Sequence, residues 1–141
     1  MSIGPAIAVA VSFVWLGMVV AISFLEAPLK FRAPNVTLQI GLGIGRLVFR
    51  ALNTIEVLWA VVIGLVIATS SLPTNAIVAA TIASAALAFQ LVAVRPFLNR
   101  RSDRVLAGQS GPRSRGHYVY VGFETIKVTA LLAAGIFLLI G

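Results

Sequence analysis

The sequence has no cysteine, a single histidine and only four acidic residues among its 141 positions. The absence of cysteine excludes disulfides, thiolate metal sites, iron–sulfur clusters and cysteine nucleophiles. With His117 alone, bis-histidine haem ligation within one chain is excluded, which disfavours a haem or quinone redox protein. No serine stands with a histidine and a carboxylate in a hydrolase pattern. We therefore predict no cofactor, no metal and no catalytic residue, and nothing in the sequence indicates an enzyme.

Charged residues of either sign are also scarce. They make up 11% of the chain, against 60% hydrophobic residues, and the mean hydropathy is +1.03. A soluble domain would be about a quarter charged. One crossing of the roughly 30 Å hydrocarbon layer needs about 20 apolar helical residues, so the chain has room for four. The composition predicts an all-α membrane protein, a single four-helix transmembrane bundle.

Four apolar runs give the expected spans, at residues 3–25, 47–69, 76–94 and 118–141. Pro28 and Pro96 are expected to stop the first and third spans. The segment before the second span carries glycines at 41, 43 and 45, whose spacing does not fit a phosphate-binding loop. We expect this segment to lie at the headgroup boundary and to lead flexibly into the second span.

The basic residues indicate the orientation. Lysine and arginine are concentrated in the loops 26–46 and 95–117 and are absent from the turn 70–75, so both basic loops are expected in the cytoplasm and both termini outside. The net charge of +7 therefore indicates anionic lipid headgroups as partners, bound by Arg100, Arg101 and Arg104, and no nucleic acid. The expected location is the bacterial inner (plasma) membrane.

Several charges cannot avoid the membrane. Only fourteen residues follow Lys127, which cover about 21 Å and leave Lys127 and Glu124 inside the fourth span. The same count places Asn53 and Glu56 inside the second. A charge that faces lipid near the bilayer centre costs at least about 2.5 to 3.5 kcal/mol, so these groups are expected to pair inside the bundle. We predict a contact between Glu56 and Lys127.

At 100° per residue, each of these two spans has one polar stripe. We predict that the stripes face each other, with Glu124 bonded to Arg50 or Tyr120. The candidate residues for a ligand or ion pathway are these polar groups and one acid at the end of the first span: Glu56, Glu124, Lys127, Asn53, Arg50, Tyr120, His117 and Glu26.

Two further patterns concern packing. Residues 52–57 align with residues 123–128, and Pro28 corresponds to Pro96, which suggests a parallel repeat of two helical hairpins. The third span is rich in alanine, a surface that lets helices approach closely, either within the chain or in a homo-oligomer. Trp15 and Trp59 lie well inside spans and are expected to serve packing.

Short motifs distributed over most of the chain resemble a family of four-span bacterial membrane proteins related to the transmembrane-protein-205-like group. The motifs are Trp15-Leu16-Gly17, Glu26-Ala27-Pro28-Leu29-Lys30-Phe31, Arg95-Pro96-Phe97-Leu98-Asn99, and His117 with Glu124 and Lys127. The resemblance implies a four-helix membrane bundle and little chemistry. A more distant similarity, to copper-resistance and protoporphyrinogen-oxidase four-span proteins, implies intramembrane histidines that this chain lacks.

Two functions remain open from the sequence. The first is a transporter or channel subunit, a homo-oligomer, with a charged intramembrane site open to the cytoplasm. The second is a structural or regulatory bundle that binds lipid or partner proteins, in which the same charges only fix the helix packing.

Overall fold

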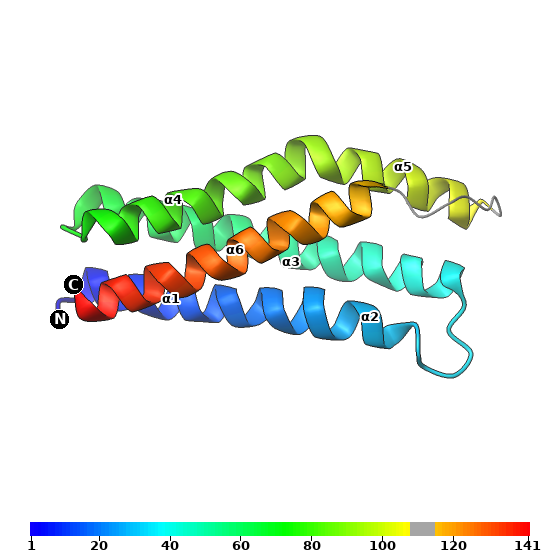
Figure 1. Cartoon of the computed structure of the whole chain (residues 1–141), viewed down its shortest axis with the longest axis horizontal. Helices are drawn as coiled ribbons and strands as arrows, with labels where there is room; N and C mark the ends of the chain where they lie inside the picture. Colours follow the sequence, from blue (N-terminus) through cyan, green and yellow to red (C-terminus); the bar gives the residue numbers. More distant parts are fainter. Residues whose placement is uncertain (108–114) are drawn as a thin grey trace.

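The structure, a computed structural model, describes residues 1–107 and 115–141, and the backbone in these ranges is almost entirely helical (Figure 1). The first rod consists of α1 (Ile3–Val19), the π-helical segment η1 (Val20–Glu26) and α2 (Ala27–Lys30). The second rod is α3 (Leu38–Thr69). The third consists of α4 (Thr74–Phe89), the π-helical segment η2 (Gln90–Val94) and α5 (Arg95–Leu106), and the fourth is α6 (Arg115–Ile140).

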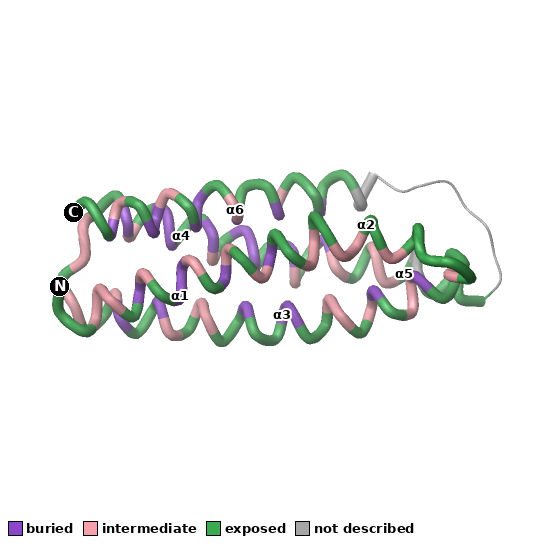
Figure 2. The backbone as a smooth tube through the Cα atoms, turned by 90° about the horizontal axis from the view of Figure 1, so that it is seen from below, coloured by how far each residue is buried: buried purple, intermediate pink, exposed green. Residues whose placement is uncertain are grey.

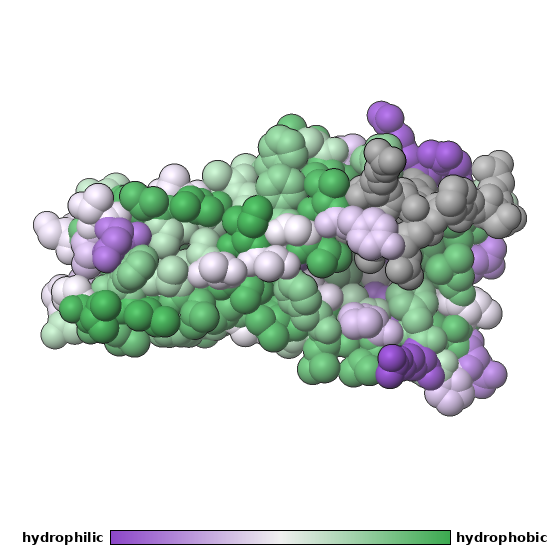
Figure 3. Space-filling model, viewed as in Figure 1, coloured by the Kyte–Doolittle hydropathy of each residue, from purple (hydrophilic) through white to green (hydrophobic). Residues whose placement is uncertain are grey.

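Each of the four rods contains a stretch that is long and apolar enough to cross a membrane, which confirms the predicted number of spans. The rods alternate in direction, so both termini lie at one end of the bundle (Figure 1). The surface of the middle of the bundle is mostly hydrophobic, while strongly hydrophilic side chains gather at the end formed by α2, α5 and the start of α3 (Figure 3). We call this the basic end.

The rods form a four-cornered bundle. α6 packs along α4 and α1, and α3 packs against α1 and α4, so α3 and α6 are diagonal to each other. Buried residues follow the inward faces of the rods (Figure 2). Trp15 and Leu131 are among the largest fully buried side chains. Polar groups that meet between α3 and α6 must therefore meet near the bundle axis.

The alanines of α4 close the packing within the chain. Five of them are buried and face the bundle, where α4 lies closely against α6: Ala76, Ala79, Ala80, Ala83 and Ala86. Ala85 and Ala88 are exposed on the outer surface. Small side chains allow the two backbones to approach. Most of this alanine surface is therefore used inside the bundle.

The prediction that Pro96 stops the third span is wrong. The rod continues through Pro96 to Leu106, because the turn before the proline is π-helical: the Arg95 N–H bonds to the Gln90 carbonyl, five residues back. Inside a regular α-helix a proline lacks an N–H and clashes with the carbonyl four residues back. The wider π-helical turn accommodates both defects. The same device precedes Pro28, where the Ala27 N–H bonds to the Ile22 carbonyl and the helix ends at Lys30.

The expected flexible lead into the second span is also wrong, because α3 already begins at Leu38. The Thr37 side chain caps it, with Oγ1 accepting from the Ile40 N–H at 3.2 Å. Asn35, at φ 67°, makes the left-handed turn that reverses the chain. The glycines allow close packing here: Gly41 and Gly45 are one turn apart on the same face and lie against Phe31 and Lys30.

Candidate functional site

Lys127 lies at the centre of the bundle and contacts two carboxylates. Its Nζ is 2.6 Å from Glu56 Oε2 and 2.5 Å from Glu124 Oε1. The three side chains are at most 1% exposed. The predicted contact between Glu56 and Lys127 is confirmed, and it joins the diagonal helices α3 and α6 across the bundle axis.

The remaining two rods supply neutral donors. The Trp15 indole N–H of α1 donates to Glu56 Oε2 at 2.8 Å. Ser23 Oγ of η1 donates to Glu124 Oε2 at 2.5 Å, and Gln90 Nε2 of η2 donates to Glu124 Oε1 at 2.8 Å. All four rods therefore contribute to one buried charge network, which we define as Trp15, Ser23, Glu56, Gln90, Glu124 and Lys127.

The predicted partners of Glu124 are wrong. Arg50 is exposed on α3, and its guanidinium is not among the ion-pair partners of the described acidic residues. Tyr120 contributes its backbone carbonyl to Gln90 at 3.3 Å and packs its ring edge-on against Phe49. Glu124 instead takes its hydrogen bonds from Lys127, Ser23 and Gln90, because the π-helical turns of the first and third rods carry their donors to it.

The two carboxylates are not equally satisfied. Both oxygens of Glu124 accept hydrogen bonds, whereas Glu56 accepts at Oε2 only. Glu56 Oε1 is buried and has no hydrogen-bond partner among the described residues. Two ionised carboxylates and one ammonium also leave the network one positive charge short of neutrality. A net charge is costly in a low-dielectric interior, so this arrangement favours the uptake of one further positive charge.

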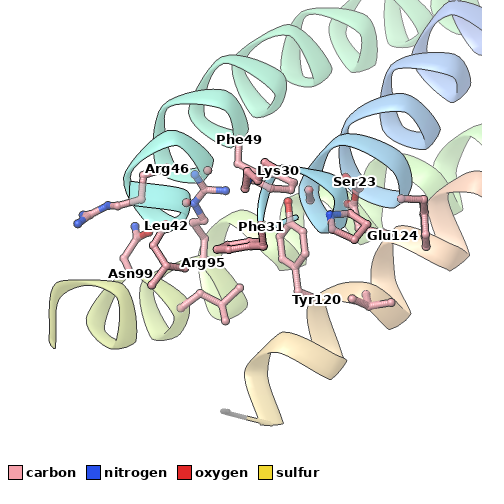
Figure 4. A pocket seen from close by; sticks show the side chains of 17 residues that line it. Ser23, Lys30, Phe31, Leu42, Arg46, Phe49, Arg95, Asn99, Tyr120 and Glu124 are labelled. Atoms are coloured by element: carbon pink, nitrogen blue, oxygen red, sulfur yellow. The ribbon is translucent and has the colours of Figure 1, made fainter. Parts of the chain in front are cut away.

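A cavity of ≈ 460 Å³ lies between the network and the basic end (Figure 4). Ser23 and Glu124 line it on the side of the network. Three cations and four aromatic rings line much of the rest, together with smaller residues: Lys30, Arg46, Arg95, Phe24, Phe31, Phe49 and Tyr120. We call this the basic-end cavity. It connects the buried carboxylate of Glu124 to the region where the positive charges of the protein gather.

A second cavity, of ≈ 320 Å³, lies beside the first between α3 and the third rod. Arg50 and Asn53 line it, and Arg46, Arg95 and Asn99 complete its polar wall. The polar stripe predicted on the second span is therefore divided. Glu56 belongs to the buried charge network, while Arg50 and Asn53 face this side cavity.

The other predicted residues lie outside the network. Glu26 is partly exposed and approaches Lys30 at 3.8 Å. His117 belongs to α6, but its side chain lies outside the described residues. Arg100 and Arg104 are exposed on α5, and their binding to lipid headgroups stays a prediction; the side chain of Arg101 also lies outside the described residues. In the described part of the chain, no three metal-binding side chains converge.

Sequence reasoning missed two members of the network and the polar role of a third. Gln90 is the only amide in the apolar run 76–94, and that isolation was a usable signal. Ser23 is one of several small polar residues in the spans, and nothing in the sequence distinguishes it from the others. Trp15 packs in the hydrophobic core as expected, yet its indole N–H also has a buried carboxylate as its partner.

Comparison with known proteins found no matching family model, curated protein or solved structure. The resemblance to the transmembrane-protein-205-like group therefore stays a prediction. The fold and the site define the class of the molecule: a membrane-type bundle of four helical rods around a buried ion-pair network. Its function has to be argued from that network and from the cavity beside it.

Proposed function

We propose that this chain is a proton-dependent membrane transport protein whose buried charge network binds one exchangeable proton. One observation carries the proposal: Glu56 and Glu124 share a single ammonium, that of Lys127, at no more than 1% exposure. Ionisable groups inside spans often belong to proton relays and substrate routes. One bound proton makes the network neutral.

The proton is assigned to Glu56. Glu124 accepts from three donors across its two oxygens, so neither oxygen is left without a partner. Glu56 Oε1 is buried and has no hydrogen-bond partner in the part of the chain that the structure describes, so a proton added there would neutralise a charge that no donor stabilises. Lys127 contacts both acids, so it keeps a carboxylate partner in either state of the site.

The route runs from the basic-end cavity to the centre of the bundle. Among the residues of the network, Glu124 and Ser23 are the ones that a proton in the cavity meets, because both line it. Lys127 then bridges Glu124 to Glu56. We place the basic end in the cytoplasm, because lysine and arginine accumulate in cytoplasmic loops. We also propose that the protein lies in the bacterial plasma membrane. We propose a homo-oligomer because a single bundle of four rods has little room for a complete transport pathway of its own.

The alternative is a structural or regulatory bundle. One observation favours it: the network joins all four rods by hydrogen bonds or ion pairs, which would also fix the register of the helices. The alternative predicts a folded protein that carries no ions and binds only lipid or partner proteins. A variant that keeps the fold but cannot exchange the proton separates the two functions.

The test uses the purified protein in liposomes that contain a pH-sensitive dye. A membrane potential should drive proton uptake above the rate of empty liposomes, and Glu56→Gln should abolish it, because glutamine imitates the protonated acid and cannot release a proton. Glu26→Gln is the matched control, since this acid lies outside the network and is partly exposed. A folded Glu56→Gln protein with wild-type flux, or wild-type flux equal to that of empty liposomes, would refute the proposal.

A further inference from the structure

We propose that the basic-end cavity binds an organic anion, a carboxylate or phosphate group carried by an apolar body. This inference deepens the proposed function, on which it rests for transport, because it names the class of substrate that would move with the proton. The volume of ≈ 460 Å³ lies within the range of small-molecule sites. The polar and apolar halves of such a ligand each have a matching part of the wall.

The anionic half is matched by two cations that flank one aromatic ring. Lys30 Nζ lies 5.6 Å and Arg95 Cζ 5.9 Å from the centroid of Phe49, and the Lys30 side chain is only 9% exposed. The ion pairs of the four acidic residues involve Lys30, Arg46 and Lys127, so Arg95 forms no ion pair with a carboxylate of the described chain. The nearest carboxylate to Lys30 is at 3.8 Å. Sheltered, incompletely paired cations favour an anionic ligand.

The apolar half is matched by the rest of the wall. Phe31, Phe49 and Tyr120 surround the cations, and Leu42 and Leu98 extend the surface. Figure 4 shows that Phe31, Tyr120 and Leu42 come from different rods and gather around one space. A small inorganic ion would leave most of these apolar groups against water. An anion with an apolar body buries them, so we favour the organic ligand.

Gly45 gives the Lys30 ammonium the room to reach the cavity. A Cβ added at Gly45 would lie 2.9 Å from Lys30 Nζ, which would displace the ammonium. Gly43, on another face of the same helix, has nothing within 4 Å of the corresponding position. The two glycines therefore provide a matched pair: alanine at 45 alters the cation of the site, and alanine at 43 does not.

Glu124 at the inner side of the cavity couples the ligand to the proton. With Glu56 ionised, the network is net negative and repels an anion in the cavity. With Glu56 protonated, the network is neutral and this repulsion disappears. The proton should therefore raise the affinity for the anion, and the anion must raise the affinity for the proton by the same factor.

The direct test measures equilibrium binding of phenyl phosphate to the full chain in phosphatidylcholine nanodiscs by isothermal titration calorimetry. Arg95→Gln should weaken binding about ten- to a hundredfold, because hydrogen bonds to charged groups are strong. Arg100→Gln is the matched control, since Arg100 is exposed on the same helix and does not line the cavity. Gly45→Ala should weaken binding and Gly43→Ala should not, which tests the site without removing a charge.

The site is refuted if Arg95→Gln and Arg100→Gln weaken binding equally, or if phenyltrimethylammonium binds as tightly as phenyl phosphate. A phosphate on an apolar body can be a soluble metabolite or a lipid headgroup. If added phosphatidylglycerol competes with phenyl phosphate, the natural ligand is a lipid headgroup. If it does not compete, the natural ligand is a soluble metabolite. Both results support the site. Glu56→Gln should keep phenyl phosphate binding and lose its dependence on pH. Proton flux without any anion binding would refute this inference alone.

Discussion

Ser23 and Gln90 donate hydrogen bonds to opposite oxygens of Glu124, and each lies in a π-helical segment that is followed, after one residue, by a proline. The prolines lack an N–H and crowd the preceding turn, and the wider turns accommodate them. The same wider turns rotate the side chains before them relative to a regular α-helix. The π-helical segments η1 and η2, which belong to the two rods beside α6, thus direct their donors to the carboxylate of Glu124.

Replacement of Gln90 by leucine should destabilise the protein by about 1.5 to 3 kcal/mol, because it removes a buried donor to a charged oxygen. Gln39→Leu is the control: Gln39 is exposed and donates only to the Val105 carbonyl at 3.3 Å. Its effect should stay within about 0.5 kcal/mol. Denaturant unfolding in detergent micelles measures both. Equal effects of the two substitutions would show that Gln90 contributes nothing specific.

Lys127→Met should be the most damaging change in the network, with a loss of about 3 to 5 kcal/mol, because two buried carboxylates then lack their cation. Glu56→Gln should stay within about 1 kcal/mol of wild type, since Lys127 keeps Glu124 at 2.5 Å. Thermal unfolding in nanodiscs gives the order of stability. A Glu56→Gln protein that is as unstable as Lys127→Met would contradict the assignment of the proton to Glu56.

Replacing each of the two tryptophans by phenylalanine should change the stability of the protein by different amounts. Trp15→Phe removes a 2.8 Å donor to Glu56 and should cost about 1 to 3 kcal/mol. Trp59→Phe removes a contact of 3.4 Å to the weak sulfur acceptor of Met18 and should cost less than about 1 kcal/mol. Chemical unfolding of the two variants decides the comparison. A larger loss at Trp59 would mean that ring packing, and not the hydrogen bond, dominates at both positions.

Alanine should act in opposite directions at two glycines of α3. Gly43→Ala has open space around it and should stabilise the helix by about 0.5 to 1 kcal/mol. Gly41→Ala would collide with the ring of Phe31 and should destabilise by about 1 to 3 kcal/mol. Melting temperatures in one detergent provide the measurement. If both alanines stabilise, the close packing of Phe31 on α3 is not present in the membrane.

The sequence predicted the parts of the structure that follow from the length of the apolar runs and from the free-energy cost of a charge in the membrane. Four apolar runs of sufficient length predicted four rods. The cost of unpaired charges in hydrocarbon predicted that Lys127 meets Glu56, an acid on the other polar stripe. Both inferences need only the rise of a helix and the expense of a charge in hydrocarbon.

The rest depended on local backbone geometry that composition does not reveal. A constant 100° per residue fails after a π-helical turn, so the faces of residues near Ser23 and Gln90 could not be projected. The rule that a proline ends a regular α-helix also made Pro96 the predicted end of the third span, although Pro96 lies inside the rod. The glycine spacing predicts a flexible segment, but Gly41 and Gly45 let Phe31 and Lys30 pack against a regular helix.

The pairing of Glu56 with Lys127 also sets an order of events during synthesis. The two residues are 71 positions apart, so at ribosomal speeds the glutamate emerges about 4 to 14 s before its lysine. During this delay the nascent second rod carries an acid with no cation to meet it. The ion pair that joins α3 and α6 can therefore form only after the last rod has been made, late in the synthesis of the chain.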